Sequence, residues 1–78
     1  MENRVLLDTV PKIKEFVDIA NHVDCDIDLK SGRATYLDAK SLLGILSCNT
    51  SEPIEVQIHD DGVIRDEFYR KIEKFMVK

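Results

Sequence analysis

The 78-residue sequence lacks the features that mark several classes of protein. It has no tryptophan, three glycines, two prolines and two cysteines, and no apolar run approaches the roughly 20 residues needed to span a bilayer. No Lys/Arg cluster is present and the net charge is −4, which argues against nucleic acid and anionic membranes as partners. The composition, 44% apolar and 33% charged, is typical of a small globular protein, and we expect one domain over residues 1–78.

The start of the chain also lacks the pattern of a targeting signal. Only three consecutive apolar residues, at positions 5–7, follow the polar residues 2–4, which is too short a run for the apolar part of a signal peptide. We therefore expect a cytoplasmic protein.

Residues that bind soft metals are few and poorly spaced. The candidates are Cys25, Cys48, His22 and His59. The cysteines form no CxxC pair, and the spacing of the four residues matches no zinc pattern. We expect free thiols, no metal and no cofactor.

The first helix is the clearest element in the sequence. Residues 4–7 suit a short first strand, Asp8 or Thr9 offers an N-cap, and Pro11 fits the first helical turn. Apolar residues then recur at i, i+3, i+4 and i+7, which predicts an amphipathic helix running to residue 21 or 22. Its apolar face consists of Ile13, Phe16, Val17 and Ala20.

Residues 23–29 alternate strictly between apolar and acidic side chains, which predicts a strand. The acidic face carries Asp24, Asp26 and Asp28, so this face of the sheet should meet water and the helices should cover the other face. The three aspartates could alternatively bind a divalent cation. Alternate strand positions are about 7 Å apart, however, and no oxygen-rich loop follows, which argues against a cation site.

The rest of the chain predicts the order β-α-β-β-α-β-α. The final helix carries a buried stripe of Phe68, Ile72, Phe75 and Met76. The expected fold is α+β, an open-faced sandwich in which a four-stranded, mostly antiparallel sheet has three helices on one face. The elements expected after the second strand are a turn at residues 30–33 around Gly32, a returning strand at 33–37, a short helix at 38–47, a polar loop at 48–53, a strand at 54–58, a turn at 59–62 and the final helix.

The short helix at residues 38–47 is more apolar than two helical turns can hide. Ser41 or a near neighbour is its expected N-cap, and a phosphate on that hydroxyl would lie beside free N–H groups and the positive end of the helix dipole. A simpler interpretation is that Ser41 is only a cap and that the apolar residues are only core. The apolar residues are Leu42, Leu43, Ile45 and Leu46.

The order of elements, together with Lys-Ser-Leu-Leu-Gly-Ile-Leu-Ser at residues 40–47, resembles the HPr family, the histidine-containing phosphocarriers of the bacterial sugar phosphotransferase system. The resemblance covers nearly the whole chain, including residues 16–17, the Gly32 hairpin, residues 54–58 and residues 66–76. It implies an HPr-like open-faced sandwich. It also implies that Ser41 matches the serine that a dedicated kinase/phosphorylase phosphorylates in low-GC Gram-positive bacteria. The residues that match the family's apolar partner-binding patch are Leu42, Leu43 and Leu46.

The sequence departs from the family at the phosphate-carrying site. The family carries phosphate on a histidine in a Gly-x-His-Ala/Thr-Arg-Pro segment that opens the first helix. Pro11 matches the proline of that segment, but Asp8, Thr9 and Val10 supply neither the histidine nor the arginine. The chemistry needs an imidazole nucleophile with cationic and N–H groups around the phosphate.

The two histidines elsewhere are poorly placed to replace the missing one. His22 lies at the far end of the first helix, about 18 Å from its start at a rise of about 1.5 Å per residue. His59 follows the last strand, and both are expected to be ordinary surface residues.

Three hypotheses follow from the resemblance and the departure. The first is a non-enzymatic regulatory or interaction protein, similar to the catabolite-repression HPr paralogue, which also lacks the carrier histidine. Its implied partners are proteins of the phosphotransferase system or of catabolite regulation, including a serine kinase/phosphorylase, and the chain would be a monomer or a weak dimer. The second hypothesis is a phosphocarrier with an atypical acceptor, and the third is a binding module that kept only the fold.

Overall fold

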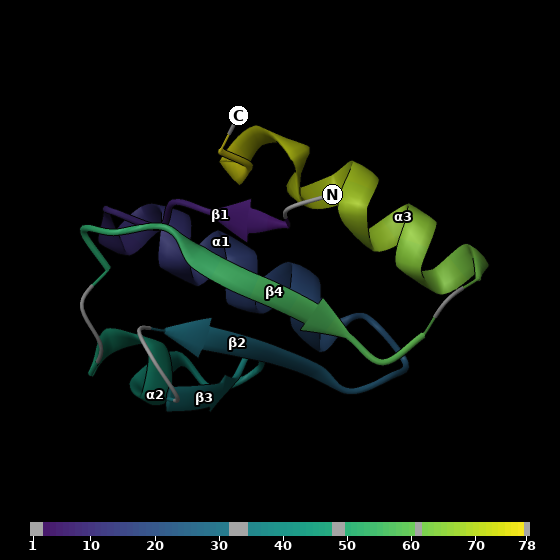
Figure 1. Cartoon of the computed structure of the whole chain (residues 1–78), viewed down its shortest axis with the longest axis horizontal. Coiled ribbons are helices and arrows are strands. Elements are labelled where there is room, and N and C mark those ends of the chain that lie inside the picture. The colour runs from purple at the N-terminus through teal and green to yellow at the C-terminus, as the bar shows by residue number, and fades with distance from the viewer. Residues whose placement is uncertain (1–2, 32–34, 48–49, 61, 78) are drawn as a thin grey trace.

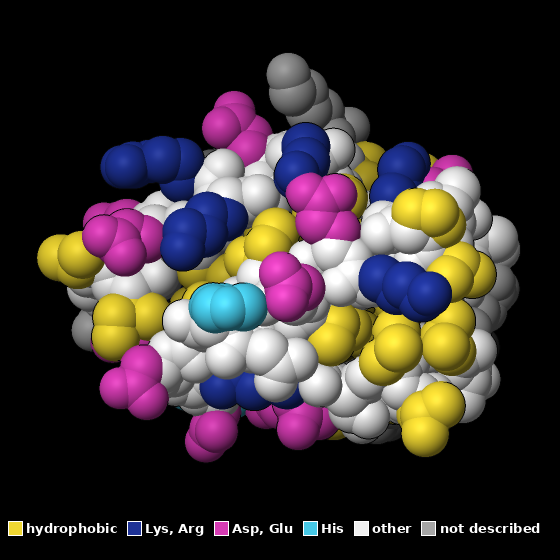
Figure 2. All heavy atoms as spheres, turned by 180° about the vertical axis from the view of Figure 1, so that it is seen from behind, with side chains coloured by type: hydrophobic (Ala, Val, Ile, Leu, Met, Phe, Trp, Pro, Cys, Tyr) yellow, Lys and Arg dark blue, Asp and Glu magenta, His cyan; other side chains and the backbone are white. Residues whose placement is uncertain are grey.

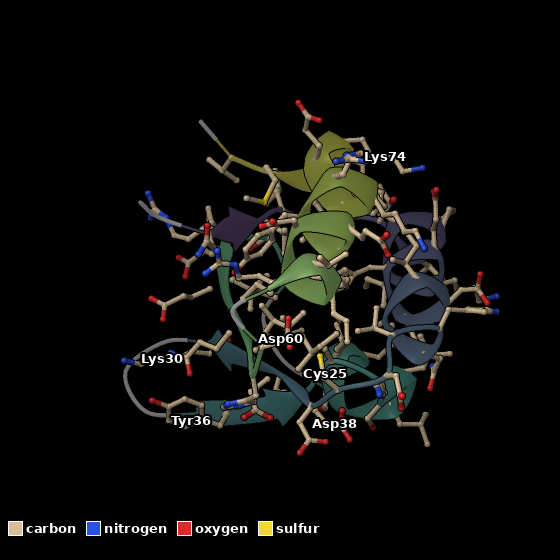
Figure 3. The ribbon with its side chains drawn as sticks, turned by 90° about the vertical axis from the view of Figure 1, so that its right-hand side faces the viewer. Cys25, Lys30, Tyr36, Asp38, Asp60 and Lys74 are labelled. Atoms are coloured by element: carbon tan, nitrogen blue, oxygen red, sulfur yellow. The ribbon has the colours of Figure 1, made fainter. Side chains whose placement is uncertain are left out.

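A computed structural model describes residues 3–31, 35–47, 50–60 and 62–77. The four strands form one antiparallel sheet in the order β1-β4-β2-β3, and the helices lie on one side of it (Figures 1 and 3). This arrangement confirms the predicted α+β open-faced sandwich. The elements are, in order, β1 (Arg4–Val5), α1 (Val10–Asn21), β2 (Ile27–Ser31), β3 (Thr35–Asp38), α2 (Leu42–Leu46), β4 (Ile54–Ile58), α3 (Val63–Ile72) and the 3-10 turn η1 (Glu73–Phe75).

The core lies between the sheet and the two longer helices. The predicted face of α1 is buried, and its Phe16 ring contacts the rings of Phe68 and Phe75 with centroid distances of 5.9 and 6.1 Å. The final stripe is confirmed at Phe68, Ile72 and Phe75, which are all buried. Met76 is the exception, because the helical segment ends at Phe75 and Met76 pairs instead with Val5 as an isolated β-bridge.

The first strand is shorter than the predicted residues 4–7, and its two edges have different partners. Its inner edge pairs with β4, and its outer edge is covered by the C-terminal segment. The Leu6 N–H donates to the Phe75 carbonyl at 2.9 Å, and the Val77 N–H donates to the Arg4 carbonyl at 2.9 Å.

The prediction of a strand at residues 23–29 was wrong at its start. The Val23 N–H still bonds the Ala20 carbonyl at the end of α1, at 3.1 Å, and β2 begins only at Ile27. Within β2 the alternation holds, because Ile27 and Leu29 are buried whereas Asp28 is not. The strand then continues to Ser31, so Lys30 belongs to the strand and not to a turn.

The hairpin between the second and third strands pairs as expected. Leu29 lies opposite Leu37 in an antiparallel register. β3 runs to Asp38, one residue beyond the predicted end at residue 37, and the predicted start at residues 33–34 lies outside the described residues. The turn predicted around Gly32 and Arg33 lies outside the described residues, as does Cys48.

The short helix α2 is confirmed but is shorter than the predicted residues 38–47. Asp38 closes β3, Ser41 is the N-cap and Ser47 is the C-cap, so only Leu42–Leu46 are helical. In the part of the chain that the structure describes, no helix is both long and apolar enough to cross a membrane.

Candidate functional site

Ser41 is the N-cap of α2, as the sequence predicts. Its Oγ accepts a hydrogen bond from the Gly44 N–H at 3.2 Å, and its carbonyl accepts one from the Ile45 N–H at 3.2 Å. At the other end of the helix, the Ser47 hydroxyl donates to the Gly44 carbonyl at 2.7 Å. The two serines therefore occupy opposite ends of the helix dipole, and an anion is favoured only near Ser41.

The segment before Ser41 is fixed to two other elements. The Asn21 side chain at the end of α1 donates to the carbonyl of Lys40 at 3.4 Å, and the Lys40 ammonium donates to the Val23 carbonyl at 2.9 Å. The Asp38 carboxylate accepts the Lys40 N–H at 2.9 Å. These contacts fix the position of the Ser41 cap, and the Lys40 ammonium is hydrogen-bonded to a backbone carbonyl.

Gly44 lies close to the Ser41 hydroxyl. A Cβ added at Gly44 would lie 3.2 Å from the Ser41 Oγ, which is tighter than an ordinary van der Waals contact. The absence of a side chain at Gly44 therefore avoids a tight contact with the Ser41 Oγ. The sequence contains this signal, a glycine three residues after the cap, but its role depends on the helical geometry.

The leucines of α2 divide into an exposed and a partly buried set. Leu43 is 80% exposed and Leu46 is 43% exposed, whereas Ile45 is fully buried. Leu42 is half-buried and packs against the core. Of the residues predicted to bind partners, Leu43 and Leu46 thus lie on the surface of α2, while Leu42 packs against the core.

A further exposed apolar residue belongs to the start of α1. Val10 is 49% exposed, and it lies in the segment that, by the resemblance, corresponds to the family's carrier site. The start of α1 and the end of α2 lie at the same end of the molecule (Figure 1). Seen from behind, hydrophobic side chains gather at this end (Figure 2). The sequence alone does not place Val10 in an apolar patch, because α1 and α2 are brought together only by the fold.

Residues 8–11 form an ordinary helix start. Thr9 is the N-cap of α1, and its hydroxyl accepts the Lys12 N–H at 3.3 Å. The Asp8 carboxylate lies 2.9 Å from the Lys12 ammonium, and this hydrogen bond holds the pKa of Asp8 below its usual range. Val10 and Pro11 fill the first helical turn, so this segment contains no imidazole.

Neither histidine lies near the start of α1. His22 is the C-cap at the opposite end of this 12-residue helix, about 18 Å away. Its Nδ1 lies 2.7 Å from the Asp18 carbonyl. His59 follows β4, and its Nε2 lies 2.8 Å from an oxygen of Asp28 on β2. Both histidines are therefore exposed surface residues, and the ring of each contacts a neighbouring aspartate residue.

Two of the surface hollows are lined mainly by charged side chains. One of about 390 Å³ is lined by Asp26, Ile27, Asp28, Asp38 and His59. Within the described ranges, however, no group of three or more His, Cys, Asp or Glu residues is arranged to hold a metal ion.

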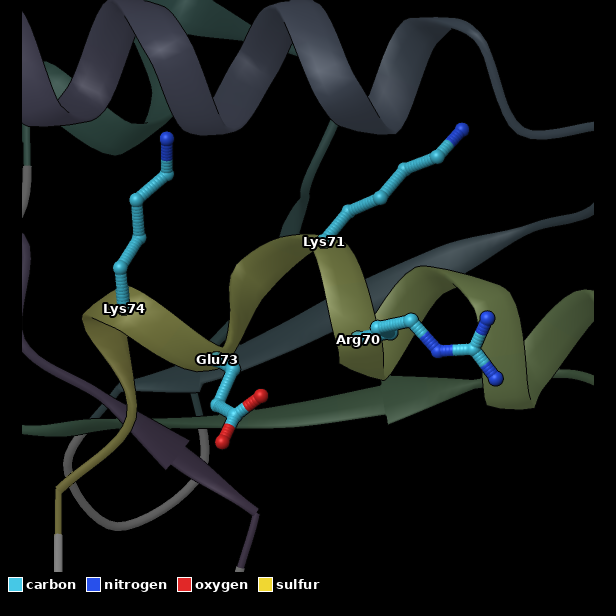
Figure 4. Close-up of a pocket in the computed structure, with 4 residues that line it drawn as sticks. All are labelled: Arg70, Lys71, Glu73 and Lys74. Carbon is cyan, nitrogen blue, oxygen red and sulfur yellow. The ribbon is translucent and has the colours of Figure 1, made fainter.

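The second hollow, of about 550 Å³, lies at the end of α3 and is lined by Arg70, Lys71, Glu73 and Lys74 (Figure 4). Lys71 and Lys74 point toward α1, where Lys74 pairs with Glu15. The side chains that line this hollow are charged, and they include no serine, threonine, cysteine or histidine.

Cys25 is a half-buried free thiol beside the start of β2. Burial raises its pKa, and the nearby carboxylate of Asp60 raises it further. A raised pKa keeps the thiol protonated at neutral pH, which makes it a poor nucleophile and a poor metal ligand.

Comparison with known proteins gave one family match. The model of the PTS-HPr family, described as "PTS HPr component phosphorylation site", matches residues 12–78. The match includes α2 with Ser41 and begins after residues 8–11. No curated protein and no solved structure matched the chain.

Proposed function

The chain belongs to the HPr family of the phosphotransferase system, and on this premise we propose that it is a regulatory or interaction protein that carries no phosphate on histidine. In this proposal Ser41 is a regulatory phosphorylation site, and Leu42, Leu43 and Leu46 bind the partner. The observation that carries the proposal is the contrast between two helix starts: α2 keeps its family serine beside exposed leucines, whereas α1 begins without a histidine.

A phosphate on Ser41 would act mainly through charge. Near neutral pH it carries about −2 charges, and at a helix N-terminus it gains on the order of 1 kcal/mol from N–H groups and the helix dipole. Leu43, two residues along, is 80% exposed, so the charge would appear at the edge of the proposed docking surface. Such a change alters the affinity for a partner without refolding the domain.

The loss of carrier chemistry is supported by the contacts at residues 8–12. Phosphoryl transfer through HPr needs an imidazole nucleophile at the helix start. Here that place is taken by the Thr9 cap, by Val10 and by the ion pair between Asp8 and Lys12. HPr proteins are phosphocarriers and not catalysts. A member without the acceptor histidine would therefore act by binding other proteins. Its partners would then be proteins of the phosphotransferase system or of catabolite regulation, in the cytoplasm.

The proposal is tested with the family's serine kinase/phosphorylase and ATP. We expect wild-type protein to gain one phosphoryl group by intact mass, and Ser41→Ala to gain none. Ser47→Ala is the matched control, because Ser47 is the exposed serine at the other end of the same helix. No phosphate on wild type, or equal loss in both variants, would contradict the assignment of Ser41.

The absence of carrier activity is tested separately with phosphoenolpyruvate and the first enzyme of the system. We expect no phosphoprotein to form. Label that appears on the wild type and disappears in His22→Ala or His59→Ala would show that one of these histidines is an atypical acceptor and would overturn this half of the proposal.

A further inference from the structure

The outer edge of β3 is the exposed edge of the sheet. In the strand order β1-β4-β2-β3, the two end strands differ, because the C-terminal segment bonds the outer side of β1 through Arg4 and Leu6. Within the described ranges, no strand pairs with the outer side of β3. Tyr36 and Asp38 lie along this edge (Figure 3). An uncovered edge strand presents unpaired N–H and C=O groups that can pair with another chain.

The register with β2 determines which backbone groups face outward. The Ala39 N–H donates to the Ile27 carbonyl at 3.0 Å, so Leu37, two residues earlier, also directs its N–H and C=O toward β2. Tyr36 and Asp38 consequently direct their backbone groups away from the sheet. The Asp38 carbonyl already accepts the Ser41 N–H at 3.0 Å, but a carbonyl has a second lone pair.

The side chains of this edge alternate between the two faces of the sheet. Leu37 lies on the helix side, where it packs against the core. Tyr36 and Asp38 lie on the open side, and Tyr36 is 56% exposed. On the neighbouring strand Lys30 lies opposite Tyr36, with its ammonium 5.9 Å from the ring centroid, and Asp28 lies opposite Asp38. The open side of this edge thus has a cationic half and an acidic half.

We propose that two copies of this chain pair along β3, antiparallel, with Leu37 opposite Leu37 of the second copy. In this register Tyr36 lies opposite Asp38 of the second copy, and the reverse pair forms by symmetry. Each of these two pairs exchanges two backbone hydrogen bonds, so the two sheets become one continuous sheet. On the helix side the two leucines form a close non-hydrogen-bonded pair.

Charge selects this register among the neighbouring ones. Across the joined sheets, the acidic pair Asp28 and Asp38 of one copy meets Tyr36 and Lys30 of the other. Shifting the pairing by about two residues in one direction puts Asp38 opposite Asp38 of the second copy, and the two carboxylates repel each other. Shifting it in the other direction puts Tyr36 opposite Tyr36 and aligns the two Lys30 side chains. Only the proposed register places the acidic half of one copy next to the half of the other copy that carries Lys30, which favours a second copy of the same chain as the occupant of this edge.

The contact is small, so the dimer should depend on concentration. The strand has four residues, and the interface falls below the range of stable complexes. Sedimentation equilibrium of the wild-type chain should therefore give a mass that rises from 9.0 kDa toward twice that value with increasing concentration. A mass that stays at one chain up to millimolar concentration would overturn the proposal.

The variants Tyr36→Pro and Tyr36→Thr form a matched pair. Proline removes the N–H that faces outward and spares the bonds to β2, whereas threonine keeps the N–H and favours a strand. We expect Tyr36→Pro to remain monomeric and Tyr36→Thr to dimerise. Equal dimerisation of the two variants would show that the edge is not the interface.

Amide hydrogen exchange on the wild-type chain gives a test that depends on no variant. Exchange at Tyr36 and Asp38 should slow about tenfold or more between dilute and concentrated protein, while Leu37 is protected at both concentrations. If these two amides become protected only when an extended peptide of another protein is added, the second copy is the wrong occupant.

Discussion

Gly44 and Ser41 are related in two ways at the start of α2. The Gly44 N–H donates to the Ser41 Oγ at 3.2 Å, and a Cβ on Gly44 would lie at the same distance, 3.2 Å, from that oxygen. The Ser41 Oγ therefore caps the helix by accepting the Gly44 N–H, and the absence of a Cβ at Gly44 avoids a tight contact with that oxygen. In an ordinary helix interior, a glycine costs about 1 kcal/mol relative to alanine.

Gly44→Ala tests whether this space matters for Ser41. The added methyl group should crowd the hydroxyl and slow its phosphorylation by the serine kinase/phosphorylase. The free energy of unfolding should change by less than about 1 kcal/mol, because the gain in helix propensity offsets the crowding. The measurements are the initial rate of phosphorylation and urea denaturation. A rate equal to that of wild type would show that the kinase does not need the space.

Leu43→Asp tests whether the exposed side of α2 binds partners. Because Leu43 is 80% exposed, the free energy of unfolding should change by about 0.5 kcal/mol or less, while binding to the kinase/phosphorylase weakens. Isothermal titration calorimetry and urea denaturation measure the two effects.

Ile45→Ala is the contrasting variant on the same helix. Ile45 is fully buried, so its truncation should lower the free energy of unfolding by about 2–5 kcal/mol. A large loss of stability in Leu43→Asp would instead place Leu43 in the core and remove the basis of the docking surface.

Periodicity predicted the longer elements of this fold well because burial on one side imposes it. The first helix and its Thr9 cap were predicted within a residue, and the strand at Ile54–Ile58 was predicted with its observed bounds. The second strand was placed too early, because an alternating acidic and apolar pattern also fits a loop that alternately faces the core and water. Val23 and Cys25 show this, since both are half-buried without belonging to a strand.

The candidate site was predicted less completely, for a different reason. Ser41 could be located from its capping pattern, but the exposure of Leu43 and the partial burial of Leu42 depend on the angle at which α2 lies on the sheet. The start of α3 likewise depends on a neighbouring residue. The Asp60 carboxylate, which precedes the helix, accepts the Gly62 N–H at 2.9 Å and the Arg65 N–H at 3.2 Å. A local pattern identifies a helix start but does not give its neighbours.

The pKa of Asp8 offers a test of the helix start that replaced the carrier site. The hydrogen bond from Lys12 holds the pKa of Asp8 below its usual range, so Lys12→Met should return it toward the ordinary value. The depressed pKa means that the stabilising pair is present above the unfolded-state pKa and is lost as pH falls through the folded-state pKa. Carboxyl NMR titration of both proteins measures the shift, and identical titration curves would show that the ion pair does not form in solution.

Cys25 provides a chemical test of the environment around the start of β2. Burial raises the pKa of its thiol, followed by the carboxylate of Asp60, so the reactive thiolate is scarce at pH 8. In a Cys48→Ser background, iodoacetamide should modify Cys25 more slowly in the folded chain than in urea. Asp60→Asn should accelerate the reaction in the folded chain, because it removes the charge and keeps an oxygen that can cap α3. Asp66→Asn, a change of the same kind on the exposed side of α3, should leave the rate unchanged. Equal acceleration by both variants would attribute the effect to net charge and not to the neighbourhood of Cys25.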